Sequence, residues 1–210
     1  MVERTDRAGV ATFFVAEEAL SPGAQMTLGE RIARHMRVLR LGPGNAIDLV
    51  DGAGHRAPAM IVRAARDAVT VELGSVDDVP APPPVHLMVP VADRDRMLWL
   101  AEKCAELGAT SWRPVLWRRS RSVTPRGEGP MFGGKIRARM VSALEQSGGA
   151  HLPQLFPEAS LDRAVAAAPA GLRLLLDSGG APIFRVAMTV PVTLAVGPEG
   201  GVEEAERAVL

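Results

Sequence analysis

The stretch TLAVGPEGGVEEAE, residues 193–206, joins a short apolar run to a glycine-rich turn and an acidic segment typical of a helix start. A glycine turn between a strand and a helix usually binds an anion, because exposed backbone N–H groups and the helix dipole favour negative charge there. Four glutamates lie in or just after this turn, at Glu199, Glu203, Glu204 and Glu206. They would repel a phosphate, so the turn predicts a ligand of different charge.

The segments before this turn alternate between strands and helices. We expect strands at 85–92, 110–117, 171–177 and 192–197, and helices at 93–109, 135–146 and 159–168. This alternation is typical of a parallel α/β sheet with right-handed crossovers. Asp93 is the expected N-cap of the helix at 93–109, and Gly108 its C-terminal stop.

The first part of the chain has a different pattern. We expect a strand at 11–16, a helix at 27–39 with Thr27 and Glu30 in capping-box spacing, and short β runs at 45–52, 56–65 and 67–74. Prolines then gather at 79–84, which is typical of a semi-rigid linker. The sequence therefore predicts a small β-barrel or sheet at 1–78, a linker at 79–84 and an α/β domain at 85–210.

The composition fits a globular protein of ordinary polarity. The N-terminus lacks the apolar core of a signal peptide, and a single cysteine, Cys104, excludes an internal disulfide, so we expect a cytoplasmic protein. Cys104 lies among alanines in an expected helix, which favours a buried, inert thiol. The histidines show no metal-ligand spacing, and we expect no metal.

The net charge of zero conceals two basic patches made almost entirely of arginine. The first, within 31–40, contains Arg31, Arg34, Arg37 and Arg40. The second, within 112–139, contains Arg118, Arg119 and Arg121 among eight cations and the two tryptophans Trp112 and Trp117. Clustered cations near aromatic side chains indicate an RNA with unstacked bases. A solvated charged surface is the alternative interpretation.

Two motifs resemble other kinds of active site. LDSGGAP at 176–182 resembles a serine-protease loop, but no histidine lies in a matching context, so we expect a loop after a strand. GPMFGGKI at 129–136 nearly matches a phosphate-binding loop, with Ile136 where a hydroxyl is needed. We expect a glycine loop before a helix there. A nucleotide-triphosphate enzyme that uses this loop is one rival hypothesis.

The chain as a whole resembles the RsmE-type ribosomal RNA methyltransferases of the SPOUT, or trefoil-knot, superfamily. The matching stretches follow the family's order over nearly the whole chain: HMRVLRLGPGNAIDLVDG (35–52), KCAELGAT (103–110), WRRSRSV (117–123), ALEQSGGAHLP (143–153) and AVGPEGGVEEAE (195–206). The resemblance implies an α/β protein with an N-terminal PUA-like barrel and a knotted methyltransferase domain. It also implies S-adenosylmethionine as cofactor, a homodimer, and methylation of N3 of one uridine in small-subunit (16S) ribosomal RNA.

This resemblance also suggests what the glycine turn holds. S-adenosylmethionine carries a sulfonium cation and an ammonium group, so nearby carboxylates are tolerable, and glycines let the backbone approach the adenosine. The expected cofactor-binding residues are Leu176, Asp177, Gly197, Pro198, Glu199, Gly200 and Gly201, with Glu145 and Gln146 lining the pocket. Arg31, Arg34, Arg37, Arg40, Arg118, Arg119 and Arg121 are expected to bind RNA, and Arg119 is the candidate for stabilising a uracilate-like anion.

The chain departs from the family pattern in three kinds of place. Gly149 and His151 stand where the family usually has basic residues, and Arg118 where it usually has a glutamate. The family also continues past the glycine turn with a further strand, an arginine-bearing loop and a helix that completes the knot. We therefore expect the chain as given to be inactive or poorly folded by itself. A noncatalytic RNA-binding relative is the second rival hypothesis.

Overall fold

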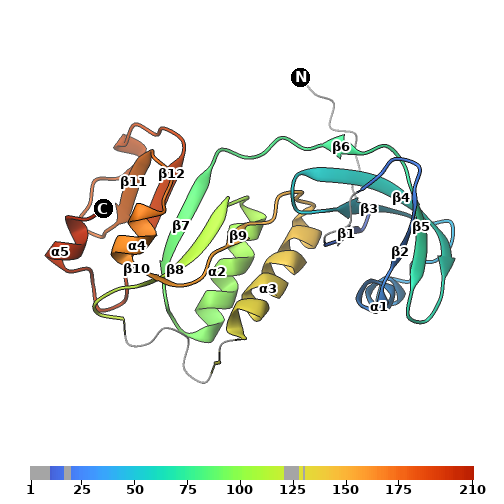
Figure 1. Ribbon diagram of the computed structural model, residues 1–210, viewed down its shortest axis with the longest axis horizontal. Coiled ribbons are helices and arrows are strands. Elements are labelled where there is room, and N and C mark those ends of the chain that lie inside the picture. The colour runs from blue at the N-terminus through green and yellow to red at the C-terminus, as the bar shows by residue number, and fades with distance from the viewer. Residues whose placement is uncertain (1–9, 17–19, 121–127, 130) are drawn as a thin grey trace. The chain divides into compact units, whose positions relative to one another are not determined.

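The computed structural model describes residues 10–16, 20–120, 128–129 and 131–210 (Figure 1). The chain forms two compact units. The first comprises the described residues up to Pro80 together with Leu144–His151, and the second comprises Ala81–Ala143 and Leu152–Leu210. None of the helices in these described ranges is long and apolar enough to cross a membrane.

The first unit is built on one six-stranded sheet. Its strands are β1 (Thr12–Phe14), β2 (Gln25–Leu28), β3 (Ala46–Val50), β4 (His55–Ala64), β5 (Val69–Leu73) and β6 (Asp77–Asp78). The order is β1-β3-β4-β5-β2, with β6 paired to β4, and among the strands that the structure describes only the β1–β3 pair is parallel. The expected barrel is therefore a mainly antiparallel sheet in which the pairings among the described strands follow an open path.

Helix α1 (Glu30–Val38) covers the core of this unit with one face. Ile32, Ala33 and Met36 are buried against Phe13 and Ile47, while the arginines of the helix are exposed. The expected capping box at Thr27 is wrong, because Thr27 lies inside β2 and the N-cap is Gly29 with no side-chain cap.

The segment 144–151 joins the first unit although it follows the linker in sequence. The Glu145 carboxylate accepts hydrogen bonds from the backbone N–H of Phe14 at 2.9 Å and from Arg31 at 3.2 Å. The Gly54 N–H donates to the carbonyl of Ala150 at 3.0 Å. The domain boundary predicted at the linker did not include the segment 144–151 in the first unit. The contacts of this segment come from single polar groups, which leave no periodic pattern in the sequence.

The second unit contains the expected parallel sheet. Its strands are β7 (Val85–Pro90), β8 (Ser111–Leu116), β9 (Gln154–Leu155), β10 (Ala159–Ser160), β11 (Leu172–Leu176) and β12 (Val192–Val196). The order is β10-β8-β7-β12-β11, with β9 paired to β8, and every pairing is parallel. The central position of β7 explains its continuous apolar sequence, since both of its faces are covered.

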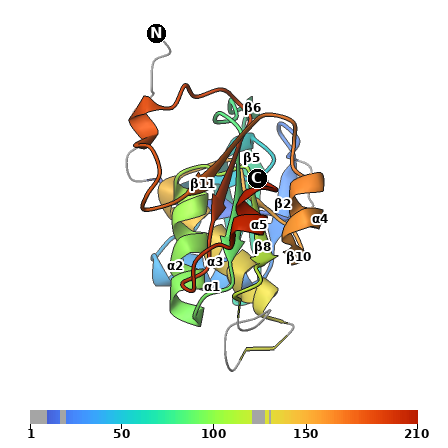
Figure 2. The same ribbon diagram turned by 90° about the vertical axis from the view of Figure 1, so that its left-hand side faces the viewer.

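Helices cover both faces of this parallel sheet (Figure 2). Helices α2 (Arg94–Glu106) and α3 (Phe132–Ser147) pack on one face, around Trp112, Val89 and Met140. Helix α4 (Leu161–Ala166) packs on the other face, around Val115 and Trp117. The sequence placed α4 at 159–168, but Ala159 and Ser160 form β10 before the helix.

The predicted ends of α2 are confirmed, whereas the predicted start of α3 is wrong. The Asp93 carboxylate accepts a hydrogen bond from the Arg96 N–H at 3.0 Å, and Gly108 adopts a positive φ of 72° just beyond the helix. Helix α3 begins at Phe132, so Gly133 and Gly134 lie in its first turn and not in a preceding loop.

Candidate functional site

A cavity of about 1010 Å³ lies at the carboxyl ends of the central strands of the parallel sheet. Three segments line it: residues 90–94 after β7, Arg119 and Ser120 after β8, and residues 196–200 after β12. Helix α2 adds Arg96, Met97, Trp99 and Leu100.

This position follows from the strand order. From β7 the chain moves first to β8 on one side and later to β11 and β12 on the other. The neighbouring strands β7 and β12 therefore mark the point where the direction of the strand order reverses, and the loops after them leave a crevice. In open α/β sheets, ligands bind in the crevice at such a switch point.

The glycine turn after β12 is packed too closely for larger residues. A Cβ atom added at Gly197 would lie 2.3 Å from Cγ2 of Val202. Gly201 adopts a φ of 83°, which residues with a side chain rarely adopt, and its N–H donates to the Pro198 carbonyl at 2.9 Å. The main chain of the turn can therefore approach a ligand in the cavity without side chains intervening.

Three of the four glutamates near the turn have arginine partners or backbone partners. Glu199 forms an ion pair with Arg96 of α2. Glu203 lies 3.4 Å from the Arg119 guanidinium, and the buried Glu206 accepts hydrogen bonds from the N–H groups of Arg118 at 2.7 Å and Glu203 at 3.0 Å. The last bond belongs to a capping box that starts α5 (Glu204–Arg207). These carboxylates connect the turn to the loop after β8.

Arg119 anchors the turn from the opposite wall of the cavity. Its Nη1 donates to the Gly200 carbonyl at 2.8 Å. The side chain remains 53% exposed, so the rest of the guanidinium can reach a ligand. Ser120 stabilises the same loop, because its hydroxyl accepts a hydrogen bond from the backbone N–H of Trp117 at 3.1 Å.

The structure brings together several residues that the sequence proposed for the cofactor. Gly197, Pro198, Glu199 and Gly200 all line the cavity, and Gly201 closes the turn beside them. Arg119, proposed for RNA and for catalysis, lines the same cavity.

Two other proposed cofactor residues flank this cavity without lining it. Leu176 pairs in register with Val196, which places the loop after β11 next to the glycine turn. The Asp177 carboxylate accepts from the Gly179 N–H and pairs with Arg207, and these two contacts lower its pKa. The segment 176–182, whose sequence resembles a serine-protease loop, is thus the end of β11 and the loop after it, as expected.

The proposed pocket residues Glu145 and Gln146 do not line the cavity at the glycine turn. Glu145 holds Phe14 and Arg31 in the first unit, and Gln146 is exposed.

The arginines proposed to bind RNA fall into different environments. Arg31 donates to the Phe14 carbonyl at 2.9 Å and to Glu145, so it has a structural role, and Arg37 donates to the Arg66 carbonyl. Arg34 and Arg40 are exposed on and just after α1. Arg118 is 66% exposed and lies 3.6 Å from Glu203, whereas Arg121 lies outside the described residues.

The contribution of α2 to the cavity was not expected from the sequence. Arg94, Arg96 and Trp99 come from its first turns and Asp93 is its N-cap, and Trp99 is 61% exposed. Their position just after the central strand was the available signal, because residues at the carboxyl ends of parallel strands meet at one edge.

Cys104 is buried, as predicted, and burial raises the pKa of its thiol to about 12. Such a thiol stays protonated and is a poor nucleophile. Within the described ranges, no three His, Cys, Asp or Glu side chains are grouped so that they could hold a metal ion.

Family comparisons divide the chain at nearly the same place as the two units, except that the segment 144–151 falls within the match that covers the second unit. The chain matches the RNA methyltransferase domain family over residues 79–210 and the RNA methyltransferase PUA domain family over residues 28–74.

Solved structures agree as well. The ribosomal RNA small subunit methyltransferase E of Neisseria gonorrhoeae, bound to S-adenosylmethionine, matches with a TM-score of 0.84 and 26% identity, over 95% of this chain and 84% of that one. A candidate methyltransferase from Legionella pneumophila, bound to the same cofactor, matches with a TM-score of 0.79 and 25% identity, over 95% and 84%. A predicted RNA methyltransferase from Thermotoga maritima shares the fold, with a TM-score of 0.73 and 24% identity, over 95% and 86%.

Proposed function

The chain belongs to the RsmE family of RNA methyltransferases, and on that premise we propose that it methylates N3 of a specific uridine in small-subunit ribosomal RNA, with S-adenosylmethionine as donor. The observation that carries the proposal is the cavity beside the Gly197–Gly201 turn, at the switch point of the parallel sheet. The two related structures that contain this cofactor support the choice of donor.

The residues that line the cavity fit this cofactor. The turn has no room for a Cβ at Gly197, so its peptide groups are free to approach and hydrogen-bond an adenosine. Glu199 and Asp93 line the cavity as carboxylates, and Arg94 and Arg96 as cations. Arg96 pairs with both carboxylates, so the ammonium and carboxylate groups of the cofactor would exchange partners with these ion pairs. The side chain of Trp99 offers a flat apolar surface. The mixed charge suits a zwitterion better than a phosphate.

Bound in this cavity, S-adenosylmethionine would supply an electrophilic methyl group for N3 of the uridine. Its S–CH3 bond would break to leave S-adenosylhomocysteine, and the N3 proton would pass to a base or to water. The task of this chain is then to position the base and to stabilise negative charge on it. Arg119 is the candidate for this role, because the Gly200 carbonyl fixes its guanidinium at the cavity wall. The raised pKa of the Cys104 thiol agrees with a reaction that needs no covalent cysteine intermediate.

We propose that the exposed Arg34 and Arg40 hold ribosomal RNA through its phosphates, and that Arg118, in the loop after β8, assists them. Arg121 stays a sequence-based candidate for the same role. Such contacts position the RNA and weaken steeply as salt rises. A homodimer is also proposed from the family, and sedimentation velocity measures it directly.

The test is methyl transfer to small ribosomal subunits that lack the modification, using protein expressed from its full reading frame. After digestion of the RNA, nucleoside mass spectrometry should detect 3-methyluridine. Methylation of another base would overturn the N3 assignment. RNA binding without any binding of S-adenosylmethionine would instead support the noncatalytic relative.

A further inference from the structure

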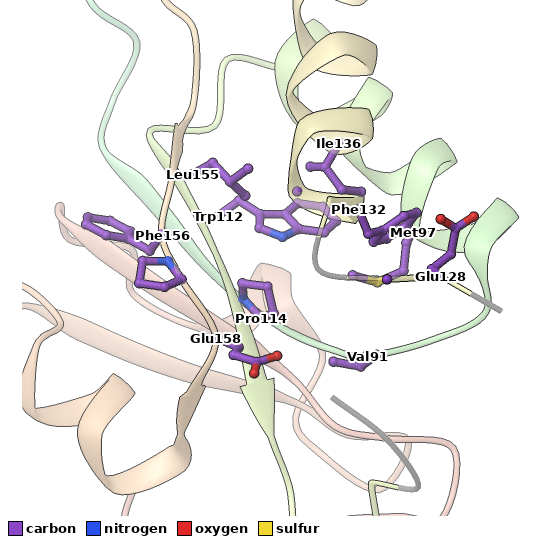
Figure 3. Close-up of a pocket in the computed structure, with 13 residues that line it drawn as sticks. Val91, Met97, Trp112, Pro114, Glu128, Phe132, Ile136, Leu155, Phe156 and Glu158 are labelled. Carbon is purple, nitrogen blue, oxygen red and sulfur yellow. The ribbon is translucent and has the colours of Figure 1, made fainter. Parts of the chain in front are cut away.

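A second cavity, of about 610 Å³, lies in the second unit between β8, the start of α3 and the segment after β9 (Figure 3). Its walls are mainly aromatic and apolar, with Trp112, Pro114, Phe132 and Phe156 among them. The volume lies within the range of small-molecule sites, which is about 300–1,000 Å³. Flat aromatic walls of this kind suit a planar ligand.

One wall of this second cavity carries an unsatisfied hydrogen-bond donor. The Trp112 side chain is fully buried, and its Nε1 has no hydrogen-bond partner among the described residues. Figure 3 draws this nitrogen on the edge of the indole that faces Pro114. A buried N–H without an acceptor is costly. Because Nε1 is itself buried, a ligand that brings a carbonyl oxygen would gain this hydrogen bond only by moving the apolar atoms that now cover the nitrogen.

The rim of the second cavity is charged. Glu128 lines it and pairs with Lys135 at 2.7 Å and with Arg94 at 2.9 Å, and each of these cations is about half exposed. The exposed Glu158 lines another part of the rim. Arg94 and Lys135 do not line the cavity, but as the partners of Glu128 they lie next to it and keep exposed surface that a phosphate can contact.

We propose that this second cavity binds an unstacked, carbonyl-bearing base of the substrate RNA, next to the uridine that is methylated. Trp112 Nε1 donates to the base carbonyl, Phe132 and Phe156 contact its faces, and Arg94 or Lys135 reaches the adjoining phosphate. Val91 and Met97 line both cavities, so they form the boundary between them. A base held beyond this boundary is a neighbour of the target and not the target itself. The proposal rests on the proposed function in taking RNA as the ligand.

The direct test observes the donor itself. The protein has three tryptophans, so a ¹⁵N spectrum of the full chain has three indole N–H signals, which Trp112→Phe and Trp117→Phe variants assign. Adding a single-stranded oligouridylate should shift the Trp112 signal. An oligomer of the same length without bases should leave it unchanged. An unshifted Trp112 signal with bound oligouridylate would overturn the proposal.

Trp117 provides a matched control for binding. It is also buried with an unpartnered Nε1 among the described residues, but it packs against α4 and lines neither cavity. Trp112→Phe keeps most of the aromatic bulk and should weaken oligouridylate binding about fivefold, the effect of one hydrogen bond, whereas Trp117→Phe should not. Equal losses in both variants would contradict the proposal.

The outcomes separate this site from the methyltransferase assignment. If the Trp112 signal shifts but no methyl transfer occurs, the base site stands and the proposed reaction fails. If methyl transfer occurs while Trp112→Phe changes neither the KM for RNA nor the indole spectrum of the complex, the base site fails and the proposed reaction stands.

Discussion

Arg119 and Gly200 are joined by a hydrogen bond of 2.8 Å, although 81 residues separate them in the chain. The bond connects the loop after β8 to the glycine turn after β12, on opposite sides of the central strand β7. It holds the two walls of the proposed cofactor cavity at a fixed separation. The site therefore depends on a basic residue and a backbone carbonyl as much as on the glycines themselves.

Replacing Gly197 by alanine should impair cofactor binding. The new Cβ would lie 2.3 Å from Val202, and overpacking of this kind shifts the backbone, so the turn should move away from its binding geometry. We expect a loss in affinity for S-adenosylmethionine of about tenfold or more, which corresponds to about 1.4 kcal/mol. Calorimetry measures the affinity. Gly134→Ala is the control, because a Cβ at that position in α3 meets open space. This variant should bind S-adenosylmethionine normally. Normal binding by Gly197→Ala would contradict the proposed location.

Arg119→Lys should slow the chemistry more than it weakens cofactor binding. Lysine has no planar guanidinium, so it cannot donate to the Gly200 carbonyl and also present further N–H groups to the cavity. We expect kcat to fall about a hundredfold, as for the loss of one anion-stabilising donor. Arg118→Lys should change kcat little, because the Glu206 contact uses its backbone N–H. Equal kcat values for the two variants would exclude the proposed role of Arg119.

Glu206→Gln should destabilise the segment after the turn. The buried carboxylate accepts two backbone N–H bonds, and an amide can accept only one of them in the same place. Leaving a buried donor unpaired costs about 1–3 kcal/mol, which thermal unfolding and faster hydrogen exchange at the Arg118 amide would reveal. The exposed Glu204→Gln is the matched variant and should unfold like the wild type.

Two arginines of α1 should behave differently when each is replaced by alanine. Arg34→Ala should weaken RNA binding and reduce the slope of log affinity against log salt by about one, as expected for one phosphate contact. Arg31→Ala should mainly lower the melting temperature, because Arg31 bonds Phe14 and Glu145. Fluorescence anisotropy over a salt series separates the two effects, and an unchanged slope for Arg34→Ala would argue against an RNA contact there.

Cys104→Ala should retain methyl transfer within about twofold, since only a small buried group is lost. The raised pKa of the thiol, about 12, also predicts that iodoacetamide leaves the folded protein unmodified at pH 8 and reacts only after unfolding. Intact-mass spectrometry measures the modification. Rapid alkylation of the folded protein together with loss of activity would contradict this account.

The sequence predicted the elements whose signal is local and periodic. The parallel strands, the Asp93 cap and the Gly108 stop are confirmed because apolar runs and cap chemistry act over a few residues. The predicted start of α3 was wrong because Gly133 and Gly134 suggested a loop. In the structure, Phe132 and Ile136 are buried in the core and hold the start of the helix there. Tertiary packing outweighed local propensity at this position.

The candidate site was predictable only in part. The glycine turn has a sequence signal of its own, so its place at a cavity was expected. The partners of Glu203 and Glu206 were not, because they lie in the loop after β8 and are brought there only by the strand order. The contact of Glu145 with the Phe14 N–H was not predictable either, because the two residues are 131 positions apart and the bond is between a single side chain and the backbone.

A crystal structure of the protein with bound S-adenosylmethionine tests the central claim most directly. We predict that the cofactor lies in the cavity between α2 and the glycine turn, with hydrogen bonds to main-chain groups of residues 197–201. A cofactor bound elsewhere, or a cavity filled by the protein's own side chains while the cofactor is bound, would contradict the account.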